Sequence, residues 1–294
     1  MRATFSGDDL QHIADDGLDQ RIKVLFPIDG IGFTDIGLLD SPPAPVTEWY
    51  GRWRTLPDAL RNPMRTYTVR NPRPAVGEVD IDFVLHGDGG PASAWASTAS
   101  PGDEIVIVGP DGRSEQRGGI EWKPGEARVV LLAGDETALP AICAILESLP
   151  AGIRGQAFIE VPHSDDALPV QTASSVMLTW LPRDGAPLGE RLSSAVRAWA
   201  AESASAPTTD AVGDSADPTG DGPDDTGLAD PGTDDVLWDV PADEPVHPHG
   251  GLYAWLAGEA GVITGLRRHL VREVGIDRSQ VAFMGYWRDG RSEN

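Results

Sequence analysis

The second half of the chain alternates continuous apolar segments with segments of helical periodicity, and this alternation constrains the fold more than any other feature of the sequence. Short apolar runs bounded by Gly and Pro predict strands over 127–135, 155–162, 174–183, 251–259 and 279–288. Apolar residues at helical spacing predict helices over 137–150, 189–202 and 261–275. Strands that are apolar throughout and separated by helices are typical of a parallel, doubly wound sheet. We therefore predict a nucleotide-type α/β parallel-sheet domain over residues 125–294.

Residues 1–124 have a different pattern, in which short strand-like runs are separated by Gly and Pro. The predicted strands are 21–28, 64–71, 78–86 and 103–110, and only 90–99 has the composition of a short helix. This pattern indicates an antiparallel barrel or sandwich. The prediction is thus a two-domain chain, with an N-terminal antiparallel β-barrel followed by the α/β domain. Two ligands held by such a pair of domains would suit electron or group transfer.

An acidic run at 201–235 interrupts the second domain. It contains ten acidic residues and neither Lys nor Arg. Its richness in Asp, Gly, Pro, Ser and Thr leaves too little apolar surface to offset the entropy of ordering. We predict a disordered acidic insertion, and an acidic interaction segment is the alternative.

The overall composition excludes several classes of protein. The formal net charge of −23 disfavours a nucleic-acid partner, because neutralising phosphates requires a basic face. No apolar run is long enough to span a bilayer, and the N-terminus has no apolar signal region. Cys143, the single cysteine, is expected to be a buried small hydrophobe rather than a ligand. These observations predict a cytoplasmic protein with no stable membrane insertion.

Catalytic side chains and metal ligands are not expected. No Ser, His and Asp arrangement has convincing spacing. His247 and His249 lie in the motif VHPHG without an evident third ligand, so a linker is the preferred interpretation. We therefore predict no metal site and no catalytic residue.

The segment Arg65-Thr66-Tyr67-Thr68 is the first candidate site. On a strand, Arg65 and Tyr67 would point to the same face. A guanidinium can bind a phosphate, an aromatic ring can pack on a flat ligand, and Thr68 can donate a hydrogen bond. The alternative is a surface arginine next to a core tyrosine.

The second candidate site is the glycine-rich stretch at 85–103. Pro91 suits the first turn of a helix, and the N–H groups that follow, those of Ala92, Ser93 and Ala94, would then face an anion. We predict a pyrophosphate cradle here, and a tight turn is the alternative. The candidate residues are His86, Gly90, Pro91, Ala92, Ser93 and Trp95.

The third candidate site is the turn between the first strand and the first helix of the α/β domain, in LLAGDETALPA. This turn lacks the GxGxxG motif. Asp135 and Glu136 disfavour a phosphate directly on it, so we expect a nicotinamide or a ribose near Gly134, Asp135 and Thr137.

Two residues give conflicting indications of the nucleotide. Glu160, at the end of the second strand of the domain, would bind a ribose hydroxyl and favour NADH. Arg183, at the end of the following strand, would accept a 2′-phosphate and favour NADPH. Ordinary charges at strand ends are the alternative for both.

Five segments in sequence order resemble one family: RIKVLFP, RTYTVR, DFVLHGDGGPASAWASTASPGD, LLAGDETALPAI and FMGYWRDGR. The chain resembles the siderophore-interacting proteins, which are flavin-dependent ferric-siderophore reductases related to the ferredoxin–NADP reductase fold. The resemblance covers nearly the whole chain outside the acidic run. It implies FAD in the barrel, with Arg65, Tyr67 and Thr68 at the flavin end and its phosphate, and the candidate residues of 85–103 around the pyrophosphate and the adenine side. It also implies NADPH or NADH on the α/β domain.

The same resemblance implies a basic cluster that binds the ferric siderophore. The candidates are Lys23, Arg288 and Arg291. The alternative for the arginines is a frayed, solvated C-terminus, and for Lys23 a solvent-facing strand position. The expected activity is electron transfer from NAD(P)H through FAD to Fe(III). Two alternatives remain: a binding protein reduced by a ferredoxin without NAD(P)H turnover, and a flavin reductase with another acceptor.

Overall fold

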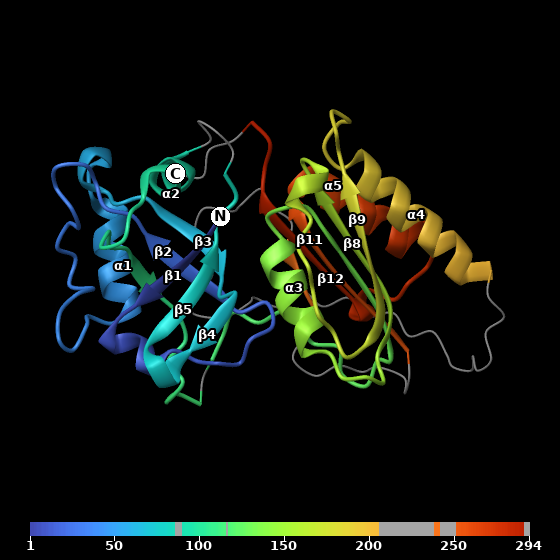
Figure 1. The fold of residues 1–294 in the computed structure, drawn as a ribbon, viewed down its shortest axis with the longest axis horizontal. Helices are drawn as coiled ribbons and strands as arrows, with labels where there is room; N and C mark the ends of the chain where they lie inside the picture. The colour runs from blue at the N-terminus through green and yellow to red at the C-terminus, as the bar shows by residue number, and fades with distance from the viewer. Residues whose placement is uncertain (86–89, 116, 206–237, 242–250, 291–294) are drawn as a thin grey trace. The chain divides into compact units, whose positions relative to one another are not determined.

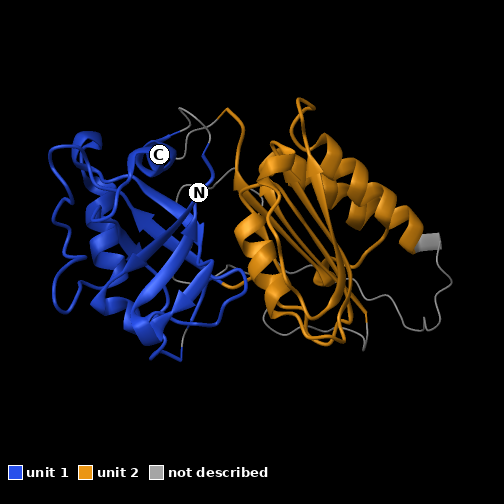
Figure 2. Ribbon diagram, in the orientation of Figure 1, with its two compact units in different colours: residues 1–119, 292–294 blue, residues 120–291 orange. Residues whose placement is uncertain are grey.

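The computed structural model describes all of residues 1–294 except 86–89, 116, 206–237, 242–250 and 291–294 (Figure 1). The chain divides into two compact units (Figure 2). Unit 1 consists of residues 1–119 with 292–294, and unit 2 consists of residues 120–291. Unit 1 is antiparallel and unit 2 is a largely parallel α/β unit, so the predicted two-domain fold class is confirmed.

Unit 1 contains two three-stranded antiparallel sheets. The first has the order β3-β2-β6, with β2 Arg21–Leu25, β3 Met64–Thr68 and β6 Val106–Val108. The second has the order β1-β5-β4, with β1 Arg2–Ser6, β4 Asn71–Arg73 and β5 Glu78–Asp82. Side chains from both sheets, such as Val24, Val79 and Ile81, pack into one buried core together with helix α2 (Pro91–Thr98).

A second helix of unit 1, α1 (Val46–Thr55), corrects the expectation that 90–99 is the only helix before residue 124. Trp49 and Trp53 lie four residues apart, so they share one helix face, and both are buried. They pack in a second core with Leu25 of β2 and Ile36. The indole of Trp53 also donates to the backbone oxygen of Asn62 at 2.9 Å. Burial of these two rings holds a helix that has no side-chain N-cap.

Unit 2 is built on a six-stranded sheet of order β10-β12-β11-β7-β8-β9. All neighbouring strands are parallel except the edge pair of β10 and β12. The strands are β7 Val129–Gly134, β8 Arg154–Val161, β9 Ser175–Pro182, β10 Trp238–Asp239, β11 Leu252–Glu259 and β12 Val281–Trp287. The strand order reverses between β7 and β11. The carboxyl ends of these two strands therefore form the topological switch point, where sheets of this kind bind ligands.

Helices cover both faces of this sheet. Helix α3 (Leu139–Ser148) lies on one face, and α4 (Glu190–Ser205) and α5 (Ala260–Arg267) lie on the other (Figure 1). Leu192, Ile263 and Phe283 are among the buried side chains that join α4 and α5 to the sheet. The remaining short elements are η1 Asp8–His12, η2 Asp58–Leu60, η3 Pro74–Val76, η4 Ser164–Asp166, the π-helical turn η5 Arg268–Glu273 and η6 Arg278–Gln280.

The predicted acidic insertion begins inside a helix, because α4 continues to Ser205. Residues 206–237, which hold the rest of the run, lie outside the described residues, as do His247 and His249. The chain returns as β10, where the carboxylate of Asp239 is bound by Arg267 at 2.8 Å and by Arg278 at 2.8 Å. The ring of Trp238 stacks on that of Tyr286, with centroids 6.1 Å apart.

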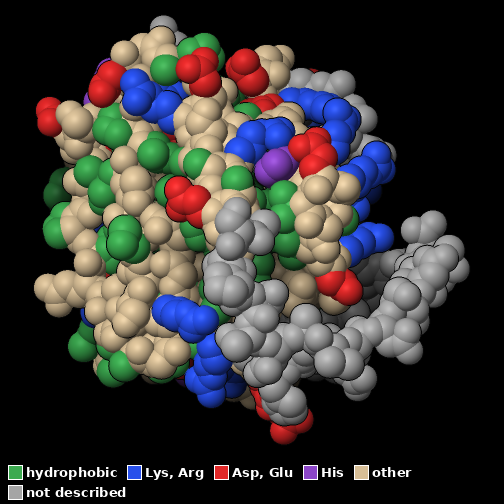
Figure 3. Space-filling view, turned by 90° about the vertical axis from the view of Figure 1, so that its right-hand side faces the viewer, with side chains coloured by type: hydrophobic (Ala, Val, Ile, Leu, Met, Phe, Trp, Pro, Cys, Tyr) green, Lys and Arg blue, Asp and Glu red, His purple; other side chains and the backbone are tan. Residues whose placement is uncertain are grey.

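The last helices of unit 2 carry several exposed arginines, although the whole chain is strongly acidic. Figure 3 shows Lys and Arg side chains together with Asp and Glu side chains on the face that it views. The exposed arginines of α4, α5 and the following turns are Arg191, Arg197, Arg268, Arg272 and Arg278. Among the described residues, no helix is both long enough and apolar enough to cross a membrane.

Candidate functional site

The candidate flavin strand, β3, presents its residues in the alternation predicted from the sequence. Arg65 pairs with Val24 of β2 and Tyr67 pairs with Ile22, so both lie on the strand face that borders the core of unit 1. The ring of Tyr67 packs against Phe83, with centroids 4.8 Å apart. Arg65 is half-buried, and its Nη1 atom donates to the backbone oxygen of Met64 at 2.9 Å. Thr68, on the opposite face, is buried.

Helix α2 begins at Pro91, as the sequence predicts. Gly90 precedes the helix with φ of +120°, a backbone conformation that residues other than glycine rarely adopt. A Cβ built at this position would have no other atom within 4 Å. Among the residues that the structure describes, no side chain caps the helix start. A helix start after such a glycine is compatible with the binding of a phosphate, and this role of α2 stays a prediction.

Two details of this cradle differ from the prediction. The N–H of Ala94 donates to the oxygen of Gly90 at 2.9 Å, so it is used inside the helix rather than for an anion. The ring of Trp95 stacks on Phe5 and lies 5.5 Å from Phe26, so its neighbours are core aromatics. Ala92 and Ser93 are buried, and His86 lies outside the described residues.

The residues of unit 1 fit a flavin dinucleotide. The start of α2 supplies backbone N–H groups for an anion, Gly90 leaves room for close approach, and β3 supplies a guanidinium and an aromatic ring. Arg65, Tyr67 and the start of α2 would hold FAD, with the charge of Arg65 available to a phosphate.

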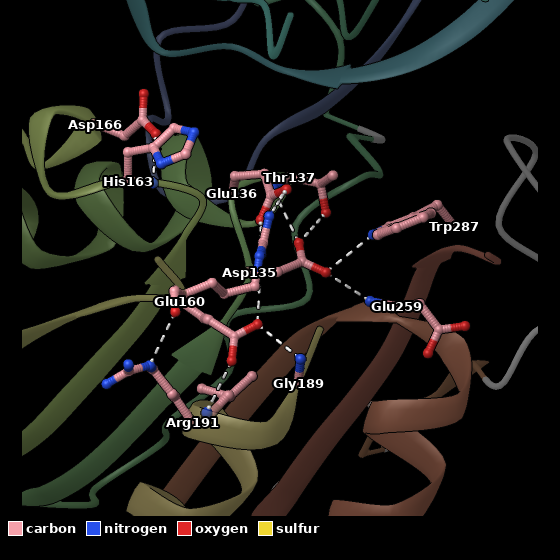
Figure 4. Close-up of polar contacts among 12 residues, drawn as sticks. Asp135, Glu136, Thr137, Glu160, His163, Asp166, Gly189, Arg191, Glu259 and Trp287 are labelled. Atoms are coloured by element: carbon pink, nitrogen blue, oxygen red, sulfur yellow. Dashed lines mark hydrogen bonds and ion pairs between the residues drawn. The ribbon is translucent and has the colours of Figure 1, made fainter. Parts of the chain in front are cut away.

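Asp135 occupies the switch point of unit 2, directly after β7. Its buried carboxylate accepts four hydrogen bonds, which are drawn in Figure 4. The donors are the backbone N–H of Thr137 at 2.9 Å, the hydroxyl of Thr137 at 2.5 Å, the N–H of Glu259 at 2.8 Å and the indole of Trp287 at 2.9 Å. Burial raises the pKa of Asp135, although the bonds from Thr137 and Trp287 act in the opposite direction. The carboxylate thus joins the ends of β7, β11 and β12.

Two glycines make this close approach possible. A Cβ on Gly258 would lie 2.6 Å from Oδ2 of Asp135, and Gly258 has φ of +147°. A Cβ on Gly134 would lie 2.5 Å from the Cβ of Ala138 and 2.6 Å from the oxygen of Ala257. Gly134 therefore serves close packing of strand and helix, one of the roles of glycine in dinucleotide-binding turns.

Glu160 and Arg183 each have partners within the protein, and their expected roles toward a nucleotide stay predictions. Glu160 is fully buried and accepts from the N–H groups of Gly189 at 2.7 Å and Leu192 at 3.1 Å, so it caps the start of α4 (Figure 4). Arg183 forms a bidentate pair with Glu136, with both N···O distances 2.7 Å. Pairing with Glu136 raises the pKa of Arg183. The sequence could not show these pairings, because the partners are distant in the chain.

The segment around Arg288 is described up to Gly290 and makes hydrogen bonds to the rest of unit 2. Trp287 donates to Asp135, and the N–H of Asp289 donates to Oε1 of Glu259 at 3.3 Å. Glu259 also caps α5 by accepting from the N–H of Val262 at 2.9 Å. Glu259 and Trp287 had no role in the sequence-based prediction. Arg291 lies outside the described residues.

Lys23 is buried rather than solvent-facing. It is only 9% exposed, and its ammonium donates to the hydroxyl of Thr66 at 2.8 Å. Such burial argues against the expected role of Lys23 in binding a bulky chelate. Arg288 is partly buried just after the end of β12, and its role in binding a chelate stays a prediction.

Comparison with known proteins agrees with this geometry. The sequence profile of siderophore-interacting proteins matches residues 127–290, and that of the siderophore-interacting FAD-binding domain matches residues 1–114. An uncharacterized protein of Mycobacterium tuberculosis is 33% identical over 283 residues, covering 96% of this chain and 82% of the relative. The ferric vibriobactin reductase ViuB of Vibrio cholerae is 34% identical over 184 residues, covering 63% of this chain and 61% of ViuB.

Solved structures show the same fold. A siderophore utilization protein from T. fusca has a TM-score of 0.64 at 25% identity, covering 99% of this chain and 87% of that one. The siderophore-interacting protein SipS from Aeromonas hydrophila has a TM-score of 0.61 at 27% identity, covering 99% and 86%. FAD is the cofactor to which the matched N-terminal domain and the geometry of unit 1 both correspond. The chain belongs to the siderophore-interacting protein family.

Proposed function

We propose that this protein is a reductase that transfers electrons from NADH or NADPH through FAD to Fe(III) in a siderophore, with release of Fe(II). In this proposal residues 1–124 hold FAD and residues 125–294 hold the nicotinamide nucleotide. The observation that supports it is that one chain combines a helix start after Gly90, at which an anion could bind, with a sheet switch point at Asp135 of the kind that binds dinucleotides. The kinship with ferric vibriobactin reductase supports the ferric substrate. We assign the reaction to the cytosol, as the composition predicts.

The residues of this chain would bind and orient the reactants rather than react themselves. Bound FAD would supply the conversion of a two-electron hydride into single electrons, which side chains cannot perform. Arg65 and the start of α2 would neutralise its phosphates, and Tyr67 would pack beside its ring system. The network of Asp135, Glu259 and Trp287 would shape the nucleotide edge of unit 2.

Arg288 would attract an anionic ferric chelate. Its neighbours Trp287 and Asp289 are fixed by the carboxylates of Asp135 and Glu259, so the guanidinium extends from an ordered backbone. Oxygen ligands bind the smaller and more highly charged Fe(III) better than Fe(II), so reduction loosens the metal and releases it. Arg291 remains a second candidate for the same role.

The direct test is anaerobic stopped-flow absorbance of the FAD-loaded protein. NADH or NADPH should bleach the flavin, and a ferric siderophore should then restore its colour while a ferrous trap reports Fe(II). Protein that binds FAD but is bleached by neither nucleotide would refute the nicotinamide route. Ferric citrate as the acceptor distinguishes a general flavin reductase, because a siderophore-specific site should favour the siderophore.

A second candidate function is a siderophore-binding flavoprotein that a ferredoxin reduces. The observation that favours it is the turn at 133–138, which lacks phosphate-binding glycines and carries two buried acids, Asp135 and Glu136. Reduction by a ferredoxin, without bleaching by either nucleotide, is the result that this alternative requires.

A further inference from the structure

We propose that Glu136 makes this protein selective for NADH over NADPH, because it holds Arg183 away from the 2′-phosphate that distinguishes the two nucleotides. This inference rests on the proposed function, since it concerns the nicotinamide donor. It concerns only unit 2 and the carboxyl edge of its sheet.

The position of the pair is the first argument. In doubly wound sheets a dinucleotide lies across the carboxyl ends of the strands, and the ribose that carries the 2′-group lies beyond the second strand of the nucleotide-binding unit. Here that strand is β8, and its neighbour β9 ends at Pro182, immediately before Arg183. Glu136 follows β7, on the turn at the switch point. The pair therefore lies along the path that the adenosine ribose should take.

The geometry of the pair is the second argument. Nη1 and Nη2 of Arg183 each bind one oxygen of Glu136 at 2.7 Å, and Nη1 also lies 3.4 Å from Glu160. The side chains are 15% and 6% exposed. This fork is the same one that would bind a phosphate. A 2′-phosphate must therefore displace Glu136, which would leave a buried carboxylate without its cation, a costly arrangement.

The local charge is the third argument. Asp135, Glu136 and Glu160 are buried acids near this edge. Arg191 is the other guanidinium beside Arg183, and its Nε donates to the oxygen of Arg183 at 3.3 Å. A phosphate adds nearly two negative charges to this acidic edge, whereas the ribose hydroxyl of NADH adds none. NADH can therefore bind without breaking the pair.

The test is isothermal calorimetry of NAD⁺ and NADP⁺ with the FAD-loaded protein, which measures binding without turnover. The wild type should bind NAD⁺ more tightly than NADP⁺. In Glu136→Gln residue 136 loses its negative charge while Arg183 stays positive, so the ratio of the two dissociation constants should shift in favour of NADP⁺ by about tenfold or more. Glu190→Gln removes an exposed acid at the start of α4 and should leave the ratio unchanged.

Double variants identify the responsible cation. The gain of Glu136→Gln should disappear when Arg183→Gln is added and should survive when Arg191→Gln is added. Flavin absorbance and the unfolding temperature check that each variant is folded. If Glu136→Gln does not fold, Glu136→Asp is the second variant. Its shorter side chain breaks the bidentate geometry and should move the ratio in the same direction.

The outcomes separate this inference from the proposed function. A wild type that prefers NADP⁺, an unchanged ratio in the Glu136 variants, or a gain that depends on Arg191 would each overturn the role of Glu136 and leave the reductase intact. Binding of neither nucleotide, with no bleaching of the flavin, would overturn the nicotinamide route itself.

Discussion

Replacing Asp135 by Asn tests the network at the switch point of unit 2. The carboxylate accepts from four donors, with Oδ1 facing Thr137 and Oδ2 facing Glu259 and Trp287. An amide has one oxygen, so its NH₂ group must face donors on one side. If the oxygen of the new amide faces Glu259 and Trp287, its NH₂ group faces Thr137. The hydroxyl of Thr137 can then rotate to accept a hydrogen bond from this NH₂ group, but the backbone N–H of Thr137 loses its acceptor. One or two buried donors left unpaired should cost about 2–4 kcal/mol.

The assay is thermal unfolding of the FAD-loaded protein, with tryptophan fluorescence as the local readout. For a unit of this size, the expected loss corresponds to a fall in Tm of roughly 5–12 °C. Asp184→Asn is the matched control, because Asp184 is exposed. If Asp135→Asn lowers Tm no more than the control does, the carboxyl group of Asp135 is already neutral in the fold and does not accept hydrogen bonds from four donors.

Three further predictions concern unit 1 and the siderophore. Hydrogen bonding to Arg73 lowers the pKa of Asp80 from 3.8 to about 2, so this pair stabilises the fold above about pH 4, and its contribution is lost as the pH falls from 4 toward 2. Asp80→Asn should therefore lower the stability at neutral pH by about 2 kcal/mol and flatten the acid limb of a stability profile, and an unchanged acid limb would contradict this. Arg65→Ala should give folded protein with reduced FAD content by flavin absorbance, whereas the exposed control Arg54→Ala should remain fully loaded; a yellow, saturated Arg65→Ala protein would remove Arg65 from the site. Arg288→Ala should raise KM for an anionic ferric siderophore about fivefold, the equivalent of roughly 1 kcal/mol, and leave flavin bleaching unchanged, while Arg272→Ala serves as the control; an unchanged KM would show that the chelate binds elsewhere.

The sheet of unit 2 could be predicted from the sequence because its strands are apolar on both faces. Runs such as 127–135 and 251–259 have few other interpretations. Helix α1 was missed, since it follows the segment SPPAP and is held by two tryptophans whose partners lie elsewhere in the chain. Strand β10 has only two residues, which is too short for any periodicity to appear.

The sequence could predict where the candidate site of unit 2 lies, but it could not predict which partners its side chains have. The turn of Gly134, Asp135 and Thr137 does lie at the switch point of the sheet. Spacing along the chain could not show that Arg183 pairs with Glu136, or that Glu160 caps a helix, because such pairings depend on the packed fold. The burial of Lys23 could not be predicted either, because alternation along a strand does not show that the face of β2 with Leu25 packs against α1.

Strand β10 bears on how long the chain between α4 and β10 can be in proteins of this fold. The carboxylate of Asp239 is bound by two arginines, and the ring of Trp238 stacks on Tyr286. These contacts hold β10 on the sheet and do not involve the residues that precede it. Helix α4 is likewise held by its own buried face, which packs in the core of unit 2. A relative in which these two anchors are joined by an open loop of another length would lose little stability, since the entropy of closing a loop rises only slowly with its length. A relative of this protein could lack the acidic run entirely and keep the same nucleotide edge.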